Sequence, residues 1–468
     1  MSSTLKYLRV GLAALLLPLA VAAQGVAAEL SPTPKQAPEQ APEQTTESAP
    51  ERFNAKFQAT YLWQTKPGFK AAYSGVNSLS PAHEKSYSFT STAYLGWRLA
   101  PQTELYFNPE VVQGVPMSGL TGLGGLSNGE LQKTAGSNPL LYRARLFVRQ
   151  TWNTGAAGDE REAVESDANQ LAGVRAQDRV VLTLGNLAVT DIFDANAYAH
   201  DARTQFMNWS FLTHGAYDFA ADSRGYSWGA ALEYYRADWA IRAGRFMMPR
   251  ESNGLVLDRA LGSHFGDQLE LEKAYALAGQ PGKARLLVFR NQAVMGGFDA
   301  ALVAAAGAVP VVAPVRTKRV KKGWGINLEQ SLTPDAGLFA RVGRSDGASE
   351  AYAFAEIDRS LSLGVTVKGA QWGRPQDVLG LALAQNGLSA SHRAFLAAGG
   401  NGFFVGDGRL NYRAESIVEG YYSVGLGQDG SLLKRSALSL GAQLIRNPAY
   451  NADRGPVRVL SVRLHTEF

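Results

Sequence analysis

The stretch FNAKFQATYLWQ, residues 53–64, alternates apolar and polar side chains at every position except Leu62. Successive side chains of a β-strand point to opposite faces of a sheet, so this pattern predicts a strand with one apolar and one polar face. The stretch has 12 residues, whereas strands of soluble proteins most often have about 5–6. A strand of this length fits a tilted crossing of a lipid bilayer.

The C-terminal residues RVLSVRLHTEF (458–468) alternate in the same way and end on an aromatic ring. Leu460, Val462, Leu464, Thr466 and Phe468 lie on one face. This ending resembles the signal that the barrel-assembly machinery of outer membranes reads. We therefore expect that machinery to be a partner of Phe468.

Periodicity marks seventeen candidate strands in the chain. Bacterial single-chain barrels have an even number of strands. We omit the weak candidate 377–385 and keep 350–358, which leaves sixteen strands with short links at one end and long links at the other. The predicted fold class is all-β: a single transmembrane antiparallel β-barrel over residues 53–468, with about 16 strands, short periplasmic turns and long extracellular loops. Residues 153–178 are expected to form one unusually long periplasmic turn.

The N-terminal residues predict export. Lys6 and Arg9 precede an apolar run and small residues up to Ala28, which is the pattern of a cleaved signal peptide over residues 1–28. Residues 29–52 are rich in Pro and Glu and predict a disordered periplasmic tether. The expected location is the outer membrane of a Gram-negative cell.

Composition and motifs exclude several classes of protein. The chain has no cysteine, which excludes disulfides and thiol catalysis. Removal of residues 1–28 lowers the net charge from +5 to +3, which is too small to predict nucleic-acid binding. The sequence has no HExxH motif, and Asp194, Asn196 and Asp201 lack the spacing of a calcium loop. We expect no enzymatic activity, no metal and no cofactor, with an outer-membrane barrel hydrolase as a remote alternative.

Charged side chains on the polar strand faces are expected to line a lumen, because an arginine facing lipid at the bilayer centre costs about 2–4 kcal/mol. In the predicted strand 139–152, the apolar face would consist of Tyr142, Ala144, Leu146 and Val148. The opposite face would then carry an arginine ladder of Arg143, Arg145 and Arg149. The same alternation places Arg242 and several glutamates, Glu110 and Glu356 among them, inside. Such a lumen suits neutral, hydroxyl-rich solutes, unless the charges only solvate the channel.

The segment 189–223 has no strand pattern, and irregular segments of this length are uncommon unless they have a function. It combines carboxylates with Arg203 and with aromatic side chains such as Trp209. We expect it to fold into the barrel and narrow it, and the alternative is a cap over the rim. The basic residues between Arg316 and Lys322 are expected to contact lipopolysaccharide phosphates.

Several segments, in order along the chain, resemble the carbohydrate-selective porins of the OprB type. They are YFNPEVVQG (106–114), DIFDANAYAHDARTQFMNW (191–209), ADSRGYSWGAALEYY (221–235), WAIRAGRFMMP (239–249) and NPAYNADRGPV (447–457). The resemblance implies a sixteen-stranded porin without a cofactor, through which glucose-like mono- or oligosaccharides diffuse into the periplasm. A homo-oligomer is compatible with it.

The resemblance also implies which residues line the pore or its constriction. These are Glu110, Arg143, Arg145, Arg149, Asp191, Asp194, Asp201, Arg203 and Trp209. Residues 300–320 and the Pro/Glu-rich tether differ from the family pattern. A general or acidic-solute porin without sugar selectivity is therefore the alternative function.

Overall fold

The computed structural model describes residues 50–155, 161–427 and 435–468 of the chain. The predicted signal peptide, residues 1–28, and nearly all of the predicted tether, residues 29–52, lie outside these described residues. No helix in the described part of the chain is long and apolar enough to cross a membrane.

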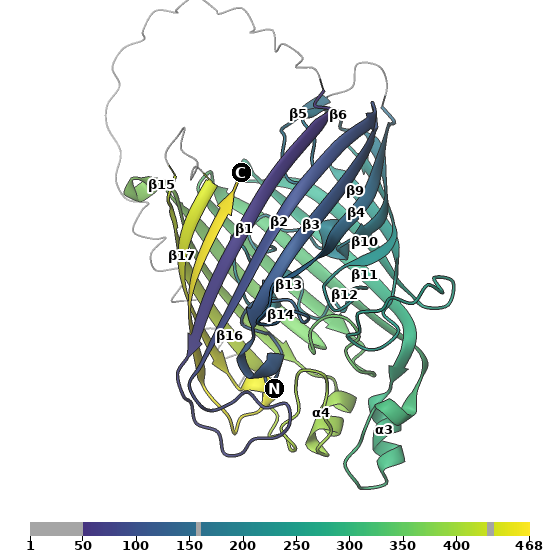
Figure 1. Ribbon diagram of the computed structural model, residues 1–468, viewed down its shortest axis with the longest axis vertical. Coiled ribbons are helices and arrows are strands. Elements are labelled where there is room, and N and C mark those ends of the chain that lie inside the picture. The colour runs from purple at the N-terminus through teal and green to yellow at the C-terminus, as the bar shows by residue number, and fades with distance from the viewer. Residues whose placement is uncertain (1–49, 156–160, 428–434) are drawn as a thin grey trace, which may run out of the picture. The chain divides into compact units, whose positions relative to one another are not determined.

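Sixteen antiparallel strands close into a barrel in which each strand pairs with its neighbours and β1 pairs with β18 (Figure 1). The predicted fold class and strand number are thereby confirmed. The barrel strands are β1 (Phe53–Lys66), β2 (Glu84–Ala100), β3 (Thr103–Val115), β4 (Leu140–Asn153), β7 (Arg179–Leu187), β8 (Ser227–Arg236), β9 (Trp239–Met247), β10 (Phe265–Leu277), β11 (Gln280–Gly296), β12 (Arg316–Thr333), β13 (Ala336–Ser345), β14 (Arg359–Gly369), β15 (Arg374–Gly387), β16 (Glu415–Gly425), β17 (Arg435–Arg446) and β18 (Val457–Glu467).

Two of the predicted strands are wrong, and the errors cancel in the count. The omitted candidate 377–385 is the centre of β15, and the retained candidate 350–358 is part of the loop between β13 and β14. In β15 the inward positions carry the small residues Gly380, Ala382 and Ala384 instead of polar ones, because loops pack closely against this wall. The alternation between polar and apolar residues is therefore weak there. Residues 350–357 are instead all buried, so this segment has no face that is exposed to water.

The two ends of the barrel differ. Short turns join the strands at one end, where the 154–178 connection also lies and forms a small hairpin, β5 (Arg161–Val164) with β6 (Gly173–Ala176). At the other end, long loops carry the helices α2 (Trp209–Leu212), α3 (Phe298–Ala305) and α4 (Ala390–Ala397) and several single 3-10 turns. Figure 1 shows α3 and α4 at the end opposite to β5 and β6. We call these the short-turn end and the long-loop end.

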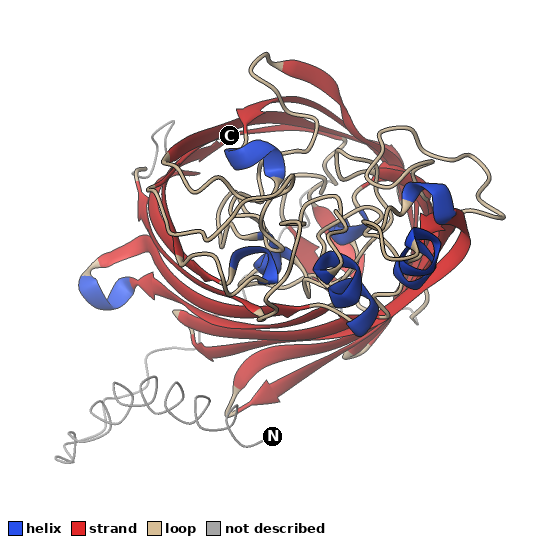
Figure 2. Cartoon of the chain, turned by 90° about the horizontal axis from the view of Figure 1, so that it is seen from below, coloured by secondary structure: helices blue, strands red, loops and turns tan. Residues whose placement is uncertain are grey.

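Much of the long-loop chain folds back inside the barrel, as Figure 2 shows from that end. We call the parts of residues 116–139, 188–226, 346–358 and 388–414 that lie inside the barrel the plug. Its aromatic side chains form one buried cluster with inward-facing residues of the wall. Phe206, for example, is fully buried and contacts the rings of Phe339 in β13 and Tyr421 in β16. The prediction that 189–223 enters the barrel agrees with this arrangement.

Charged side chains on the inner wall bind the backbone of the plug. Glu419 accepts hydrogen bonds from the backbone N–H groups of Met207 (2.6 Å) and Asn208 (2.9 Å). Arg463 donates to the carbonyl oxygens of Ala202 and Gln205, each at 2.7 Å. Buried backbone groups that lack a strand partner need such bonds, which contribute about 1.5–3 kcal/mol each when one group is charged.

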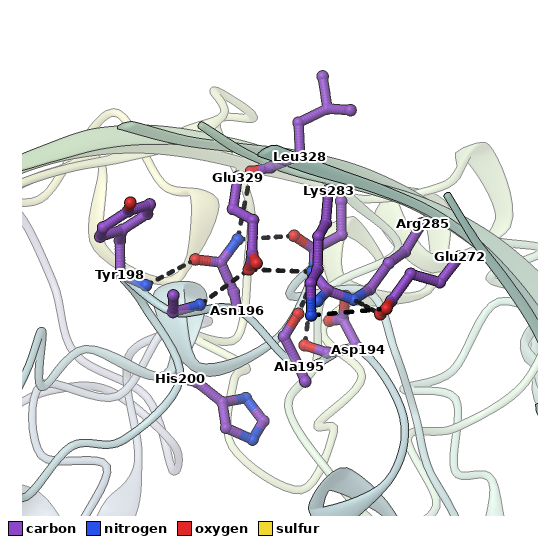
Figure 3. Close-up of polar contacts among 12 residues, drawn as sticks. Asp194, Ala195, Asn196, Tyr198, His200, Glu272, Lys283, Arg285, Leu328 and Glu329 are labelled. Atoms are coloured by element: carbon purple, nitrogen blue, oxygen red, sulfur yellow. Dashed lines mark hydrogen bonds and ion pairs between the residues drawn. The ribbon is translucent and has the colours of Figure 1, made fainter. Parts of the chain in front are cut away.

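Figure 3 shows one of these attachments, between the loop 188–226 and β12. The Ala197 N–H donates to Glu329 (2.9 Å), and the Asn196 side-chain amide donates to the Leu328 carbonyl oxygen (3.2 Å). Glu329 also accepts from Arg285 of β11 (3.0 Å). The side chain of Leu328 points away from the plug, to the outer face of the wall.

The outer face is apolar in its middle and charged near the long-loop end. Exposed leucines and isoleucines cover the middle, and Ile241, Leu269, Leu286, Leu328 and Leu460 are each between 40 and 54% exposed. Nearer the long-loop end, Arg245, Asp267 and Arg290 stand side by side on adjacent strands, with ion pairs of 2.7 and 2.6 Å. An apolar band bounded by charge fits a lipid bilayer.

The predicted basic loop 316–322 is instead the beginning of β12, because β11 and β12 extend beyond the predicted strand ends. Lys318 and Lys322 are exposed on the outer side. Lys321 is buried and pairs with Asp218 of the plug (3.0 Å), and Arg316 pairs with Glu350 (2.8 Å). Only part of this run is therefore placed to meet lipid headgroups.

The position of the apolar band predicts where a new charge is most costly. Leu328→Arg should lower the free energy of unfolding by about 2–4 kcal/mol, because residue 328 faces the middle of the band. Val320→Arg, on the outer side of the same strand near its long-loop end, should cost about 0–1 kcal/mol. Urea titration of the protein in lipid vesicles, followed by tryptophan fluorescence, measures both. Equal losses would contradict the placement of the bilayer.

Candidate functional site

An ion pair between the wall and the loop 188–226 lies at the centre of the site. Asp191 ends the 3-10 turn Val189–Asp191, which follows β7 directly and turns the chain into the barrel. Its carboxylate accepts two hydrogen bonds from Arg145 of β4, at 2.7 Å from Nε and 2.6 Å from Nη2. This bidentate geometry fixes the guanidinium plane. The third nitrogen, Nη1, is buried and has no hydrogen-bond partner among the described residues.

Glu110 of β3 forms the second part of the site. Its carboxylate is fully buried and is surrounded by donors from four parts of the chain. The donors are Thr92 (2.6 Å), Gln132 (3.0 Å), Arg203 (3.1 Å), Tyr226 (3.3 Å) and the hydroxyl of Tyr142. Because so many donors converge on it, Glu110 positions the tyrosine rings more rigidly than a single hydrogen bond could.

Arg203 connects this cluster to the plug. Its guanidinium donates to both carboxylate oxygens of Glu130 (2.9 and 3.0 Å) and to the hydroxyl of Tyr94 (3.3 Å). Burial raises the pKa of Glu130, although the neighbouring Arg203 favours its charged form. Burial also opposes the charge on Arg203, but Glu130, Tyr94 and Glu110 together keep its pKa well above the ordinary value. Arg203 therefore keeps its positive charge inside the barrel.

Aromatic rings line the same region. The guanidinium of Arg145 lies 5.2 Å from the centre of the Tyr226 ring, and the ring of Tyr142 lies 6.1 Å from that of Tyr226. Aromatic faces beside fixed donors and acceptors can bind a sugar, whose C–H faces are apolar and whose edges carry hydroxyls.

An inner cavity of about 710 Å³ adjoins this cluster on the side of the short-turn end. Asp191 lines it, together with Arg149, Arg242 and Tyr235. Arg149 donates to the Asn169 carbonyl oxygen (3.0 Å). Arg242 forms ion pairs with Glu233, Glu270 and Glu272 at 2.8 to 3.3 Å. The expectation that these two arginines face the lumen agrees with their positions. We call the cluster around Arg145, Asp191, Glu110, Arg203 and Tyr226 the constriction.

Asp194 and Trp209, which the resemblance assigns to the pore, lie in the plug instead. Asp194 is buried and accepts from the backbone N–H of His214 (2.7 Å) and from Asn327 (2.7 Å). The ring of Trp209 stacks on Phe354 at 4.9 Å. Both residues hold the loop in place without lining the inner cavity. Asp201 is exposed, and its carboxylate accepts from the Arg203 backbone N–H (2.9 Å).

Arg143 faces the outside of the barrel, so its assignment to the lumen is wrong. Pro109 pairs with Arg143, and Asn108 pairs with Arg145, which leaves Ala144 as an extra residue. Such a β-bulge reverses the alternation of faces along the strand. Tyr142 therefore points inward with Glu110, while the Arg143 guanidinium lies over the outward ring of Trp228 at 5.1 Å.

Sequence reasoning missed Tyr94, Glu130, Tyr142 and Tyr226. The tyrosines were assigned to lipid-facing positions or to none, because a tyrosine suits the apolar face of a membrane strand as well as a lumen. Pro109 in the middle of a strand is the one local signal for the bulge, since proline within sheets is confined to edges and bulges.

The family model described as carbohydrate-selective porin, OprB family, matches residues 77–468 of the chain. No curated protein sequence matches the chain. Among solved structures, the chain is similar to the high-pH structure of Pseudomonas putida OprB, with a TM-score of 0.67 and 15% sequence identity over 89% of this chain and 94% of that chain. At this identity the likeness shows the fold.

Two further structures are less similar. The low-pH structure of Pseudomonas putida OprB has a TM-score of 0.47 and 12% identity over 89% of this chain and 93% of that chain. Pseudomonas aeruginosa OccK11 has a TM-score of 0.44 and 10% identity over 89% of this chain and 96% of that chain.

A lysine inside the plug predicts a pH dependence of stability. Lys133 donates to the Ala353 carbonyl oxygen and lies 5.2 Å from the ring of Phe404 and 5.6 Å from that of Trp209. Burial lowers the pKa of Lys133 from 10.5 to about 7. Between these two values the unfolded chain binds a proton that the native amine has lost, so the native state gains stability as the pH rises. Below a pH of about 7 both forms are charged and this gain is absent.

Urea midpoints measured across this pH window test the effect. Wild type should gain stability towards high pH, and Lys133→Met should lose that component of the slope. Lys318→Met, which changes an exposed lysine at the rim, is the matched control and should keep the wild-type slope. An unchanged slope in Lys133→Met would mean that Lys133 keeps its proton inside the plug.

Proposed function

The chain belongs to the carbohydrate-selective porin family of the OprB type, and from this membership we propose that it carries glucose-like sugars through its constriction. It is an outer-membrane porin, and the family consists of channels rather than enzymes. We place the long-loop end outside the cell and the short-turn end in the periplasm, as in other bacterial barrels. Residues 1–28 would then direct export, and residues 29–52 would form a periplasmic tether.

One observation carries the proposal of sugar passage. The Arg145–Asp191 pair stands beside aromatic rings at the outer boundary of the inner cavity, and Arg145 Nη1 has no partner among the described residues. A buried donor without a partner is costly, so a passing hydroxyl gains a hydrogen bond there. The fixed carboxylates supply acceptors, and the rings of Tyr226 and Tyr142 can pack against the sugar.

The two arginines of the inner cavity continue this path. Arg149 and Arg242 lie nearer the short-turn end and are held in place by carboxylate or carbonyl partners. Successive donors of this kind can exchange a sugar's hydrogen bonds step by step, which lowers the cost of removing its water shell. Lipopolysaccharide phosphates near Lys318 and Lys322, and the barrel-assembly machinery at Phe468, are further proposed partners.

Conductance of the purified protein in a planar bilayer tests sugar passage directly. Glucose should block the ion current in a concentration-dependent way, because the sugar occupies the constriction. Arg145→Gln should raise the half-blocking concentration several-fold, since the loss of hydrogen bonds worth on the order of 1 kcal/mol each changes affinity by about fivefold to tenfold.

Arg290→Gln is the matched control, because Arg290 is an exposed arginine on the outer wall. It should leave sugar block at the wild-type level. Block that is unchanged in Arg145→Gln would remove this residue from the sugar path. A channel that conducts ions but shows no block by any sugar would favour the general-porin alternative.

A further inference from the structure

The barrel wall is incomplete beside the constriction. β7 has 9 residues and pairs only with residues 146–153 of β4, which has 14. The first residues of β4, from Leu140 to Arg145, therefore have no strand partner on the β7 side. The chain leaves β7 at Leu187 and turns into the barrel. No strand therefore continues the wall from β7 towards the long-loop end.

A cavity of about 700 Å³ lies at this gap. Arg143, Trp228 and Met247 line it from the outer face of the wall, because they alternate with inward-facing neighbours. Tyr142 and Tyr226 line it as well, and both donate hydrogen bonds to Glu110 inside the barrel. The cavity therefore extends from the outer face of the wall to the two tyrosines that bind Glu110. We call it the side window.

The side window is strongly basic. Four arginines and one carboxylate line it: Arg143, Arg224, Arg250, Arg259 and Asp222. None of the four arginines forms an ion pair with a carboxylate of the described chain. Asp222 is occupied by the backbone N–H groups of Arg224 (2.9 Å) and Tyr226 (3.2 Å). The inner cavity differs, because Arg242 there is paired with three glutamates.

The side window also leads to the constriction, whereas the centre of the barrel is filled. The plug side chains Phe206, Phe211, Tyr217 and Tyr352 are all fully buried, so these side chains have no water-accessible surface. Tyr226, in contrast, contacts both the side window and the guanidinium of Arg145.

We infer that solutes enter through the side window, and that its arginines make carboxylated sugars the preferred class of solute. This inference rests on the proposed function, because it assigns the entrance and the solute class of the same constriction. Unpaired positive charges at a narrow entrance raise the local concentration of anions. Their effect reaches roughly one Debye length, about 8 Å at physiological ionic strength, which is comparable to the size of a monosaccharide.

Thiol modification tests the entrance. The chain contains no cysteine, so an introduced thiol is unique. Val256→Cys places it on the lip of the side window, and Val303→Cys places it on α3 at the same end of the barrel, where residue 303 is 81% exposed. A maleimide carrying a long polyethylene glycol chain, added from the long-loop side, should remove more than half of the conductance of Val256→Cys. The modified Val303→Cys protein should conduct as before.

Charge removal tests the solute class. Recordings in a phosphatidylcholine bilayer, which offers no net anionic headgroup, compare block by galacturonate with block by galactose. Arg250→Gln with Arg259→Gln should raise the half-blocking concentration of galacturonate several-fold and leave that of galactose unchanged. Arg344→Gln with Arg359→Gln removes the same charge from exposed outer-wall positions and should change neither value.

The possible results distinguish failure of the side entrance or of the anion preference from failure of the proposed sugar passage. Full conductance of modified Val256→Cys would overturn the side entrance, and equal changes for galacturonate and galactose would overturn the anion preference. In both cases sugar block of wild type would still support the proposed function. Absence of block by either sugar in wild type would overturn the proposed function itself.

Discussion

Loops inside a barrel must find partners for their backbone groups, and this requirement shapes the whole interior. The wall supplies those partners as charged side chains, which bind the N–H and carbonyl groups that strands would otherwise pair. Burying a charge is costly unless it is fully hydrogen-bonded, so each such contact also holds the wall side chain in one orientation. Plug and wall therefore stabilise each other. The wall residues that act in this way include Arg341, Glu415, Glu419, Arg463 and Glu329.

The inner cavity lies along one part of the barrel wall. The plug is bound by strands on several sides of the barrel, including β3, β10, β12, β13, β16 and β18, whereas the inner cavity lies along β3, β4, β7, β8 and β9. This explains why only one part of the inward-facing charge set has a place in the constriction, and why a count of lumen charges overestimates the number that a solute meets.

The sequence was sufficient to predict the barrel, because lipid imposes the same alternation on every strand. Prediction failed where that constraint is relaxed. β15 packs small residues against the plug, and residues 350–357 are buried all round. For the site, alternation correctly placed Glu110, Arg145, Arg149 and Arg242 inside. It could not identify Asp194 and Trp209 as plug residues, because their partners Asn327 and Phe354 are distant in sequence.

The bulge at Ala144 and the short strand β7 belong together. Where β4 has no partner, its backbone is free to leave regular register, and one extra residue turns Tyr142 inward and Arg143 outward. The Asn186 side chain donates to the Ala144 carbonyl oxygen (2.7 Å) and so satisfies the free edge at this point. A regular β4 would put Tyr142 in lipid and leave Glu110 without one of its donors. Because the wall is irregular here, Tyr142 lies between the side window and Glu110 of the constriction.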